Sequence, residues 1–141
     1  MIMVDTGPLV ALADADDACH TACARWYDSV NPQNLVIPTP VIAEVCHLLQ
    51  HRCGTHVEAS FLDALATGQL GVVTGLMPED IERMAQLVRQ YADLPLGGTD
   101  ACVVALAERW KAKQVSTVDR KHFSIVRPAH VPAFELLPDD L

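Results

Sequence analysis

Short, mostly apolar runs alternate along this chain with longer segments whose apolar residues recur at helical spacing. Each run is closed by a polar or turn-forming residue, which is typical of buried strands. These runs cover residues 2–4, 35–37, 71–73 and 115–118, and a short fifth strand is expected near residues 125–126. Helical spacing predicts helices at 8–13, from 16 towards 30, from 39 to 53, after Gly54, from Pro78 and from 99 to 110.

Several of these helix starts carry capping signals. Thr39 and Thr99 each precede a helical segment and are predicted to be its N-cap. The segment from Thr55 to Glu58 has the spacing of a capping box. The helix that begins at Pro78 is predicted to be amphipathic, with one apolar face made of Ile81, Met84, Val88 and Tyr91.

The alternation of strands and helices predicts the fold class. Parallel strands need crossover connections, and those connections cover both faces of the sheet. We therefore expect a compact three-layer α/β/α sandwich with a mainly parallel sheet of four or five strands. Neither a repeat nor a linker divides the sequence, so residues 1–141 are expected to form a single domain.

The composition is that of a globular protein in a reducing compartment. Half of the 141 residues are hydrophobic and a fifth are charged, and no apolar run approaches the length of a membrane span. The first residues do not resemble a signal peptide, because Asp5 follows the opening apolar run without a basic flank. Five cysteines, an odd number, favour reduced thiols and a cytoplasmic location.

The formal net charge of −8 argues superficially against a nucleic-acid partner, but the charge is unevenly distributed. Six of the ten lysines and arginines fall between residues 109 and 127, where Asp119 is the only acid. Such a basic segment could form a rim beside an acidic cleft and contact a polyanion. A solvated helix end followed by a charged turn explains the segment equally well.

Four acidic residues lie where a predicted strand ends or a predicted helix begins: Asp5, Glu44, Asp100 and Asp119. In a parallel sheet, the carboxyl ends of the strands and the amino ends of the following helices share one edge, where ligand sites form. Four carboxylates gathered there would repel one another without a cation. Their oxygen atoms suit a hard divalent ion, Mg²⁺ or Mn²⁺. This pattern makes metal-dependent phosphodiester chemistry the leading hypothesis.

Each acid also has a simpler interpretation when it is taken alone. Asp5 could cap a helix, Glu44 could lie on a solvated rim, Asp100 could complement a helix dipole, and Asp119 could shape a turn. Asp93 is a weaker fifth candidate, which more simply shapes the loop before Thr99. A single geometric arrangement accounts for the four positions together, whereas the simpler interpretations need four separate accounts.

The order of these short motifs resembles the PIN-domain ribonucleases, and most of all the VapC toxins of VapBC toxin–antitoxin pairs. The matching motifs are Val4-Asp5-Thr6, Pro40-x-x-x-Glu44, Thr99-Asp100-Ala101 with Ala105-Leu106-Ala107, and Thr117-x-Asp119 with Phe123. The resemblance implies a PIN-like fold and an endoribonuclease that uses Mg²⁺ or Mn²⁺. It also implies a homodimer and a small antitoxin that blocks the cleft.

By the same resemblance, the four matching acids are metal ligands and catalytic residues: Asp5, Glu44, Asp100 and Asp119. Thr6 and Thr117 match positions at which a hydroxyl supports the site. Thr99, beside Asp100, is added to these supporting residues.

Other functions compete with this hypothesis. A zinc site could use Cys46, His47, His51 and Cys53, although packed thiols and exposed imidazoles are the simpler interpretation. A phosphatase of the haloacid-dehalogenase type would want a second aspartate at the position of Gly7. A non-enzymatic partner-binding module is a further alternative. An apolar groove for a dimer mate or an antitoxin helix could be lined by Trp26, Tyr27, Phe61 and Leu62.

Overall fold

A five-stranded parallel sheet forms the centre of the computed structural model, which describes all 141 residues. The strands are β1 Ile2–Val4, β2 Leu35–Pro38, β3 Val72–Thr74, β4 Gln114–Ser116 and β5 Glu135–Leu137. They lie in the order β3-β2-β1-β4-β5, and every neighbouring pair is parallel. The central strand β1 therefore has neighbours on both sides, and the predicted parallel sheet is confirmed.

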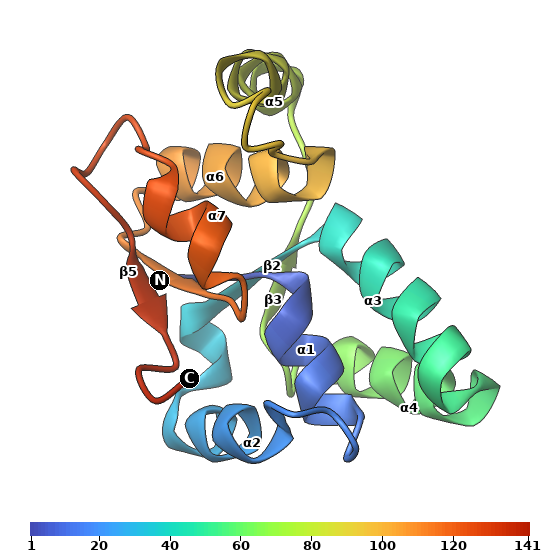
Figure 1. Cartoon of the computed structure of the whole chain (residues 1–141). Coiled ribbons are helices and arrows are strands. Elements are labelled where there is room, and N and C mark those ends of the chain that lie inside the picture. The colour runs from blue at the N-terminus through green and yellow to red at the C-terminus, as the bar shows by residue number, and fades with distance from the viewer.

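Helices cover both faces of this sheet and complete the three layers (Figure 1). They are α1 Thr6–Ala13, α2 His20–Ser29, α3 Thr39–Cys53, α4 Thr55–Ala66, α5 Pro78–Gln90, α6 Gly98–Trp110 and α7 Arg120–Ile125, with a 3₁₀ turn, η1, at Pro32–Asn34. Crossovers between parallel strands are right-handed. The chain runs outwards from β1 through β2 to β3 and then returns to β4, on the other side of β1. Helices α5, α6 and α7 therefore lie on the opposite face of the sheet from α1 and α2 (Figure 1).

Helix α6 is the most buried helix and fixes the middle of the molecule. All residues from Ala101 to Ala107 are buried, because α6 packs on the sheet with one face and under α5 with another. Two ion pairs join α5 to α6, Arg83 with Glu108 at 2.7 Å and Arg109 with Asp80 at 3.0 Å. These contacts fix the carboxyl-terminal turn of α6 against α5.

The apolar face predicted for α5 is wrong in part. Ile81 and Val88 are exposed, whereas Leu87 is fully buried and Asp80 is buried with it. Asp80 turns inward because its carboxylate accepts hydrogen bonds from Arg109 and from the backbone N–H of Met77. A buried, paired carboxylate thus replaces part of the apolar stripe that the spacing predicted.

The second helix begins later than predicted, at His20 rather than near Asp16. The aspartates of this segment bind backbone amides in turns: Asp14 accepts from the N–H of Asp16, and Asp17 accepts from the N–H of Cys19. Aspartate side chains that bond the backbone two residues on favour turns over helix. The acids therefore delay the helix instead of starting it.

The caps predicted at Thr39, Thr55 and Thr99 are also wrong. The residues at the three N-cap positions are Pro38, Gly54 and Gly97, and none of the three helices has a side-chain cap. Gly54, with a φ of 89°, is both the C-cap of α3 and the N-cap of α4. Because glycine has no side chain, the N-cap of α4 cannot form a capping box. As a result, α3 and α6 begin without a side-chain cap from their N-cap residues.

The carboxyl-terminal part differs most from the prediction. Residues 125–126 are not a strand: Ile125 is the last residue of α7, and the fifth strand is formed by Glu135–Leu137 beside β4. Asp119 caps α7 by accepting a hydrogen bond from the backbone N–H of His122, which makes this segment helical. No helix is both long and apolar enough to span a membrane.

Candidate functional site

The four acids selected from the sequence lie around one end of the sheet. Asp5 directly follows β1, and Asp119 follows β4, the strand that pairs with β1. Glu44 lies in α3, which begins where β2 ends, and Asp100 lies in the first turn of α6. The charges of Glu44 and Asp100 act on Asp5, and that of Asp119 acts on Asp100, so the carboxylates are electrostatic neighbours.

Asp5 is the innermost of the four, with 5% of its surface exposed. Its backbone N–H donates to the carbonyl oxygen of Ser116 at 2.9 Å, which ties the end of β1 to β4. Burial raises the pKa of Asp5 to about 7, and the charges of Asp100 and Glu44 add to this effect. A hydrogen bond from Thr117 acts in the opposite direction, but does not outweigh the burial.

Glu44 and Asp100 line an open, polar hollow of about 410 Å³ between α3 and α6. The other lining residues are Pro40, Ala43, Gly97, Gly98 and Thr99. Burial raises the pKa of Asp100 above its ordinary value, and the charges of Asp119 and Glu44 raise it further, while His122 lowers it. The hollow is therefore an acidic cleft in which neighbouring carboxylates disfavour the ionisation of Asp100.

Asp119 is held by three local contacts. Its backbone N–H donates to the Thr117 hydroxyl at 2.9 Å, and its Oδ1 accepts the backbone N–H of His122 at 2.9 Å. Its Oδ2 lies 2.6 Å from Nδ1 of the His122 ring. Asp100, Asp119 and His122 each offer one ligand atom within 4.8 Å of the others, which is the spacing of a cation site.

The ion pairs of the structure leave this end of the sheet unbalanced. Lysine and arginine side chains pair with acids elsewhere: Arg25 with Asp140, Arg52 with Asp14 and Asp17, Arg83 with Glu108, and Arg109 with Asp80. None of them pairs with the four acids at the cleft, and His122 is the one basic partner there. Asp100 and Asp119 lie at ligand spacing with His122, whereas Asp5 and Glu44 belong to no group of three ligand atoms within 4.8 Å of one another. Partly buried carboxylates that no lysine or arginine pairs with fit a divalent cation.

The three threonines expected to support the site differ in their roles. Thr117 is fully buried and donates its hydroxyl to Oδ2 of Asp5 at 2.8 Å. Thr6 is buried, and its hydroxyl has no hydrogen-bond partner. Thr99 lines the cleft as the second residue of α6. Asp93 lies exposed in the turn between α5 and α6, as expected for a loop residue.

His122 belongs to the cluster but was absent from the sequence analysis. The available signal was its position three residues after Asp119, which places both at the start of a short helix. The sequence does not reveal it because the residues after Asp119 are typical of a charged turn followed by a short strand near 125–126, whereas they form the helix α7. The zinc quartet, in contrast, does not assemble: no three of Cys46, His47, His51 and Cys53 bring ligand atoms within 4.8 Å.

The basic segment 109–127 does not form one rim. Arg109 pairs with Asp80, and Arg120 donates to the carbonyl oxygens of Leu136 and Pro138. Lys111 and Lys113 line a hollow with Met1, Gln114 and Glu135, at the opposite end of β4 from Asp119. Of this segment, Lys121, which is exposed in the first turn of α7, lies close in sequence to the cleft residue Asp119.

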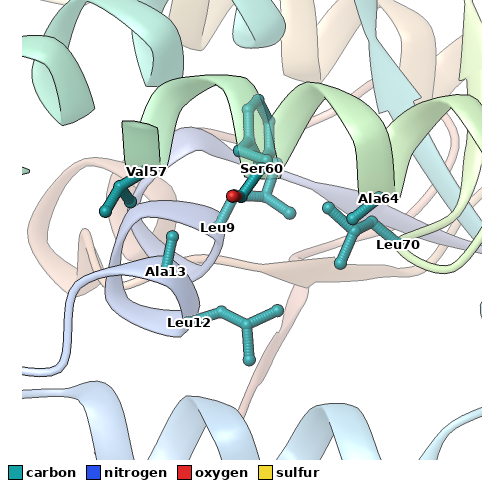
Figure 2. Close-up of a pocket in the computed structure, with 8 residues that line it drawn as sticks. Leu9, Leu12, Ala13, Val57, Ser60, Ala64 and Leu70 are labelled. Atoms are coloured by element: carbon teal, nitrogen blue, oxygen red, sulfur yellow. The ribbon is translucent and has the colours of Figure 1, made fainter. Parts of the chain in front are cut away.

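An apolar pocket of about 300 Å³ lies between α1 and α4. Figure 2 shows Leu12 and Ala13 of α1 opposite Val57, Ser60 and Ala64 of α4, with Leu9 and Leu70 completing the wall. Of the four residues predicted to line a groove, only Phe61 contributes to this pocket. Tyr27 is buried, with its hydroxyl donating to Leu70, while Leu62 is exposed and Trp26 lines a separate hollow near the carboxyl terminus.

Comparison with known proteins identifies the family. The family model described as PIN domain matches residues 2–127. The chain belongs to the PIN-domain family. Its similarity to Ribonuclease VapC26 of Mycobacterium tuberculosis (strain ATCC 25618 / H37Rv) is 34% identity over 137 residues, which cover 97% of this chain and 100% of the relative. The recognition of a PIN-domain protein related to the VapC ribonucleases is thus confirmed.

Solved structures of two other proteins have a similar fold. The crystal structure of Mycobacterium tuberculosis VapC20, described as a Sarcin-Ricin loop cleaving toxin, superposes with a TM-score of 0.75 at 23% identity, over 82% of this chain and 87% of that one. FitAcB from Neisseria gonorrhoeae gives a TM-score of 0.64 at 18% identity, over 84% and 88% of the two chains. Membership of the PIN-domain family decides against the haloacid-dehalogenase alternative.

Proposed function

We propose that this chain is a metal-dependent endoribonuclease in which Asp5, Glu44, Asp100 and Asp119 hold Mg²⁺ or Mn²⁺. The observation that carries the proposal is the buried carboxylate of Asp5, whose pKa rises to about 7 beside Glu44 and Asp100. A buried, charged carboxylate is expensive without a balancing cation. The 34% identity to Ribonuclease VapC26 supports RNA as the substrate.

The four acids would have different roles in binding the metal and the attacking water. Asp5 and Asp100 would hold the principal ion, Glu44 would act directly or through a water, and Asp119 would hold a second ion or orient the attacking water. A bound divalent ion supplies an activated water and neutralises the charge that develops on the phosphate and on the leaving oxygen. Attack in line with the 3′ oxygen would leave 5′-phosphate and 3′-hydroxyl ends on the two products.

The rest of the cleft is suited to receive a phosphate backbone. Gly97 and Gly98 line the hollow without side chains, so a strand of RNA can approach the backbone there. Helices α3 and α6 both begin at this edge without side-chain caps. The positive ends of their dipoles favour anionic groups of the substrate. These features offset part of the negative field of the four acids.

A cleavage assay on RNA tests the proposal. Wild-type protein with Mg²⁺ or Mn²⁺ should cut RNA, and chelation of the metal should abolish the cleavage. Asp5→Asn and Asp100→Asn should each lower the rate by at least about a hundredfold, because each removes charge from the ion's position. Asp63→Asn, an exposed substitution on α4, is the matched control and should leave the rate unchanged. Full activity of either cleft variant would refute the mechanism.

The same resemblance supports an antitoxin partner, and we place its contact at the pocket between α1 and α4. An amphipathic helix could lay apolar side chains into this pocket, which has seven hydrophobic residues among its eight. Ser60→Arg should block the pocket without disturbing the core, because Ser60 is exposed. It should abolish copurification with the small protein expressed from the adjacent upstream reading frame. The control Leu62→Arg, on α4 but outside the pocket, should leave this copurification unchanged.

We also propose that the chain forms a homodimer. Val72 and Val73 are exposed on β3, which is an edge strand, and exposed apolar edges are sites of association. Light scattering of the purified chain should give twice the monomer mass of 15.3 kDa. A monomer at all concentrations up to about 100 μM, well above typical dissociation constants of stable dimers, would contradict this expectation.

A further inference from the structure

His122 brings a nitrogen atom into an otherwise all-oxygen cluster. It lies in α7 three residues after Asp119, and its ring reaches back towards the carboxylates of Asp119 and Asp100. The three ligand atoms lie within 4.8 Å of one another, although Asp100 comes from α6 on a different part of the chain. The long-range convergence of these groups is not explained by the capping of α7, which needs only Asp119 and the backbone of His122.

The contact between His122 and Asp119 is close but is not a hydrogen bond. Nδ1 of His122 lies 2.6 Å from Oδ2 of Asp119, yet this buried nitrogen has no partner in hydrogen-bond geometry. At this separation the ring nitrogen and the carboxylate oxygen are close enough to contact one shared positive centre. Neutral imidazole and carboxylate are also the side chains that most often share a transition-metal ion.

We propose that His122 is itself a ligand of the metal, at a position formed with Asp100 and Asp119, and that its nitrogen gives the site a preference for Mn²⁺ over Mg²⁺. This inference rests on the proposed function, since it assigns a further donor to the same cleft. Magnesium is a hard ion that selects oxygen ligands, whereas Mn²⁺ accepts an imidazole nitrogen more readily. The nitrogen therefore costs little for Mn²⁺ binding and disfavours Mg²⁺ at this position.

Pulsed electron paramagnetic resonance of the Mn²⁺-loaded full chain tests this directly, because it detects a ¹⁴N nucleus bound to the ion. Wild-type protein should give the ¹⁴N coupling of a bound imidazole, and His122→Ala should lose it. The control His56→Ala, at an exposed histidine of α4, should keep it. The backbone N–H of residue 122 can still donate to the capping carboxylate of Asp119 in every variant, so the helix should persist.

Affinity measurements give a second readout that does not depend on RNA cleavage. His122→Ala should weaken Mn²⁺ binding by about tenfold and Mg²⁺ binding by less than about twofold. His122→Asn replaces the nitrogen donor with an amide oxygen, and should likewise reduce the ratio of Mn²⁺ to Mg²⁺ affinity. An equal effect of either variant on both ions would overturn the assigned preference.

The outcomes separate this inference from the proposed function. Tight Mn²⁺ binding without a ¹⁴N coupling would overturn the role of His122 and leave the four-acid site intact. Failure of the wild-type chain to bind Mn²⁺ at all would overturn both. A ¹⁴N coupling that survives in His122→Ala would assign the nitrogen to another residue and also refute the inference.

Discussion

The hydroxyl of Thr117 donates a hydrogen bond to Oδ2 of Asp5 at 2.8 Å, across 112 positions of sequence. The same hydroxyl accepts the backbone N–H of Asp119 at 2.9 Å. One buried side chain therefore fixes two of the four acids, one after β1 and the other after β4. These two hydrogen bonds couple the positions of Asp5 and Asp119 to the pairing of β1 with β4.

Thr117→Val should weaken metal binding while leaving the fold intact. Valine has nearly the same shape as threonine, but it leaves Asp5 without its donor and Asp119 without its acceptor. A hydrogen bond to a charged group contributes about 1.5–3 kcal/mol, so the Mn²⁺ affinity should fall by at least about tenfold. Thr117→Ser keeps the hydroxyl and should remain close to wild type. Calorimetric titration of the three proteins with Mn²⁺ measures the difference.

Asp5→Asn should stabilise the metal-free protein although it destroys the proposed activity. The pKa of Asp5 rises from an ordinary 3.8 to about 7, and each unit corresponds to about 1.4 kcal/mol. At pH 8 the free energy of unfolding should therefore increase by about 2–4 kcal/mol in the variant. Urea denaturation without metal measures it. A less stable variant at pH 8 would show that the Asp5 charge is already balanced.

The pH dependence of that gain has a definite sign. Because the pKa of Asp5 is higher in the folded state, its contribution to stability is fully present below the unfolded value of 3.8 and is lost as the pH rises through about 7. The advantage of Asp5→Asn should thus be absent near pH 4, grow from pH 4 to 7 and be constant above. Saturating Mn²⁺ at pH 8 should stabilise only the wild type, so the wild type should then have the larger free energy of unfolding.

Gly7 should not tolerate a side chain. A Cβ at this position would overlap Cγ2 of Val118 and lie 3.2 Å from its Cβ, because the first turn of α1 approaches the segment between β4 and α7 closely. Gly7→Ala should cost about 1–3 kcal/mol of stability, although alanine usually favours a helix. Val118→Ala in the same chain should recover most of the loss. Thermal unfolding of both single variants and the double variant tests this coupling.

The sequence predicted those parts of the fold that depend on short-range patterns. The first four strands and the three-layer class follow from apolar runs and helical spacing, which reflect burial directly. The strand at Glu135–Leu137 could not be predicted because its three residues form a strand only by pairing with β4. The helix α7 was missed for a related reason: the apolar pair Ile125 and Val126 is typical of a strand, but the cap at Asp119 determines the local structure.

The candidate site shows the same division between local and long-range information. Asp5, Glu44, Asp100 and Asp119 were predicted because each lies at the end of a strand or the start of a helix. Thr117 was found only through a family resemblance, since a buried hydroxyl has no distinctive spacing. The pocket at α1 and α4 depends on the packing of two helices, so residues such as Trp26 and Leu62 could not be assigned to it from apolar character alone.

A titration of the purified, metal-free chain with Mn²⁺, compared with that of Asp100→Asn, tests the central claim most directly. The clustered carboxylates predict that the wild type binds Mn²⁺ specifically, with binding strengthened as the pH rises through 7 and Asp5 loses its proton. Asp100→Asn should lose this binding while its circular dichroism spectrum stays unchanged. Equal Mn²⁺ affinity in both proteins would contradict the four-carboxylate site.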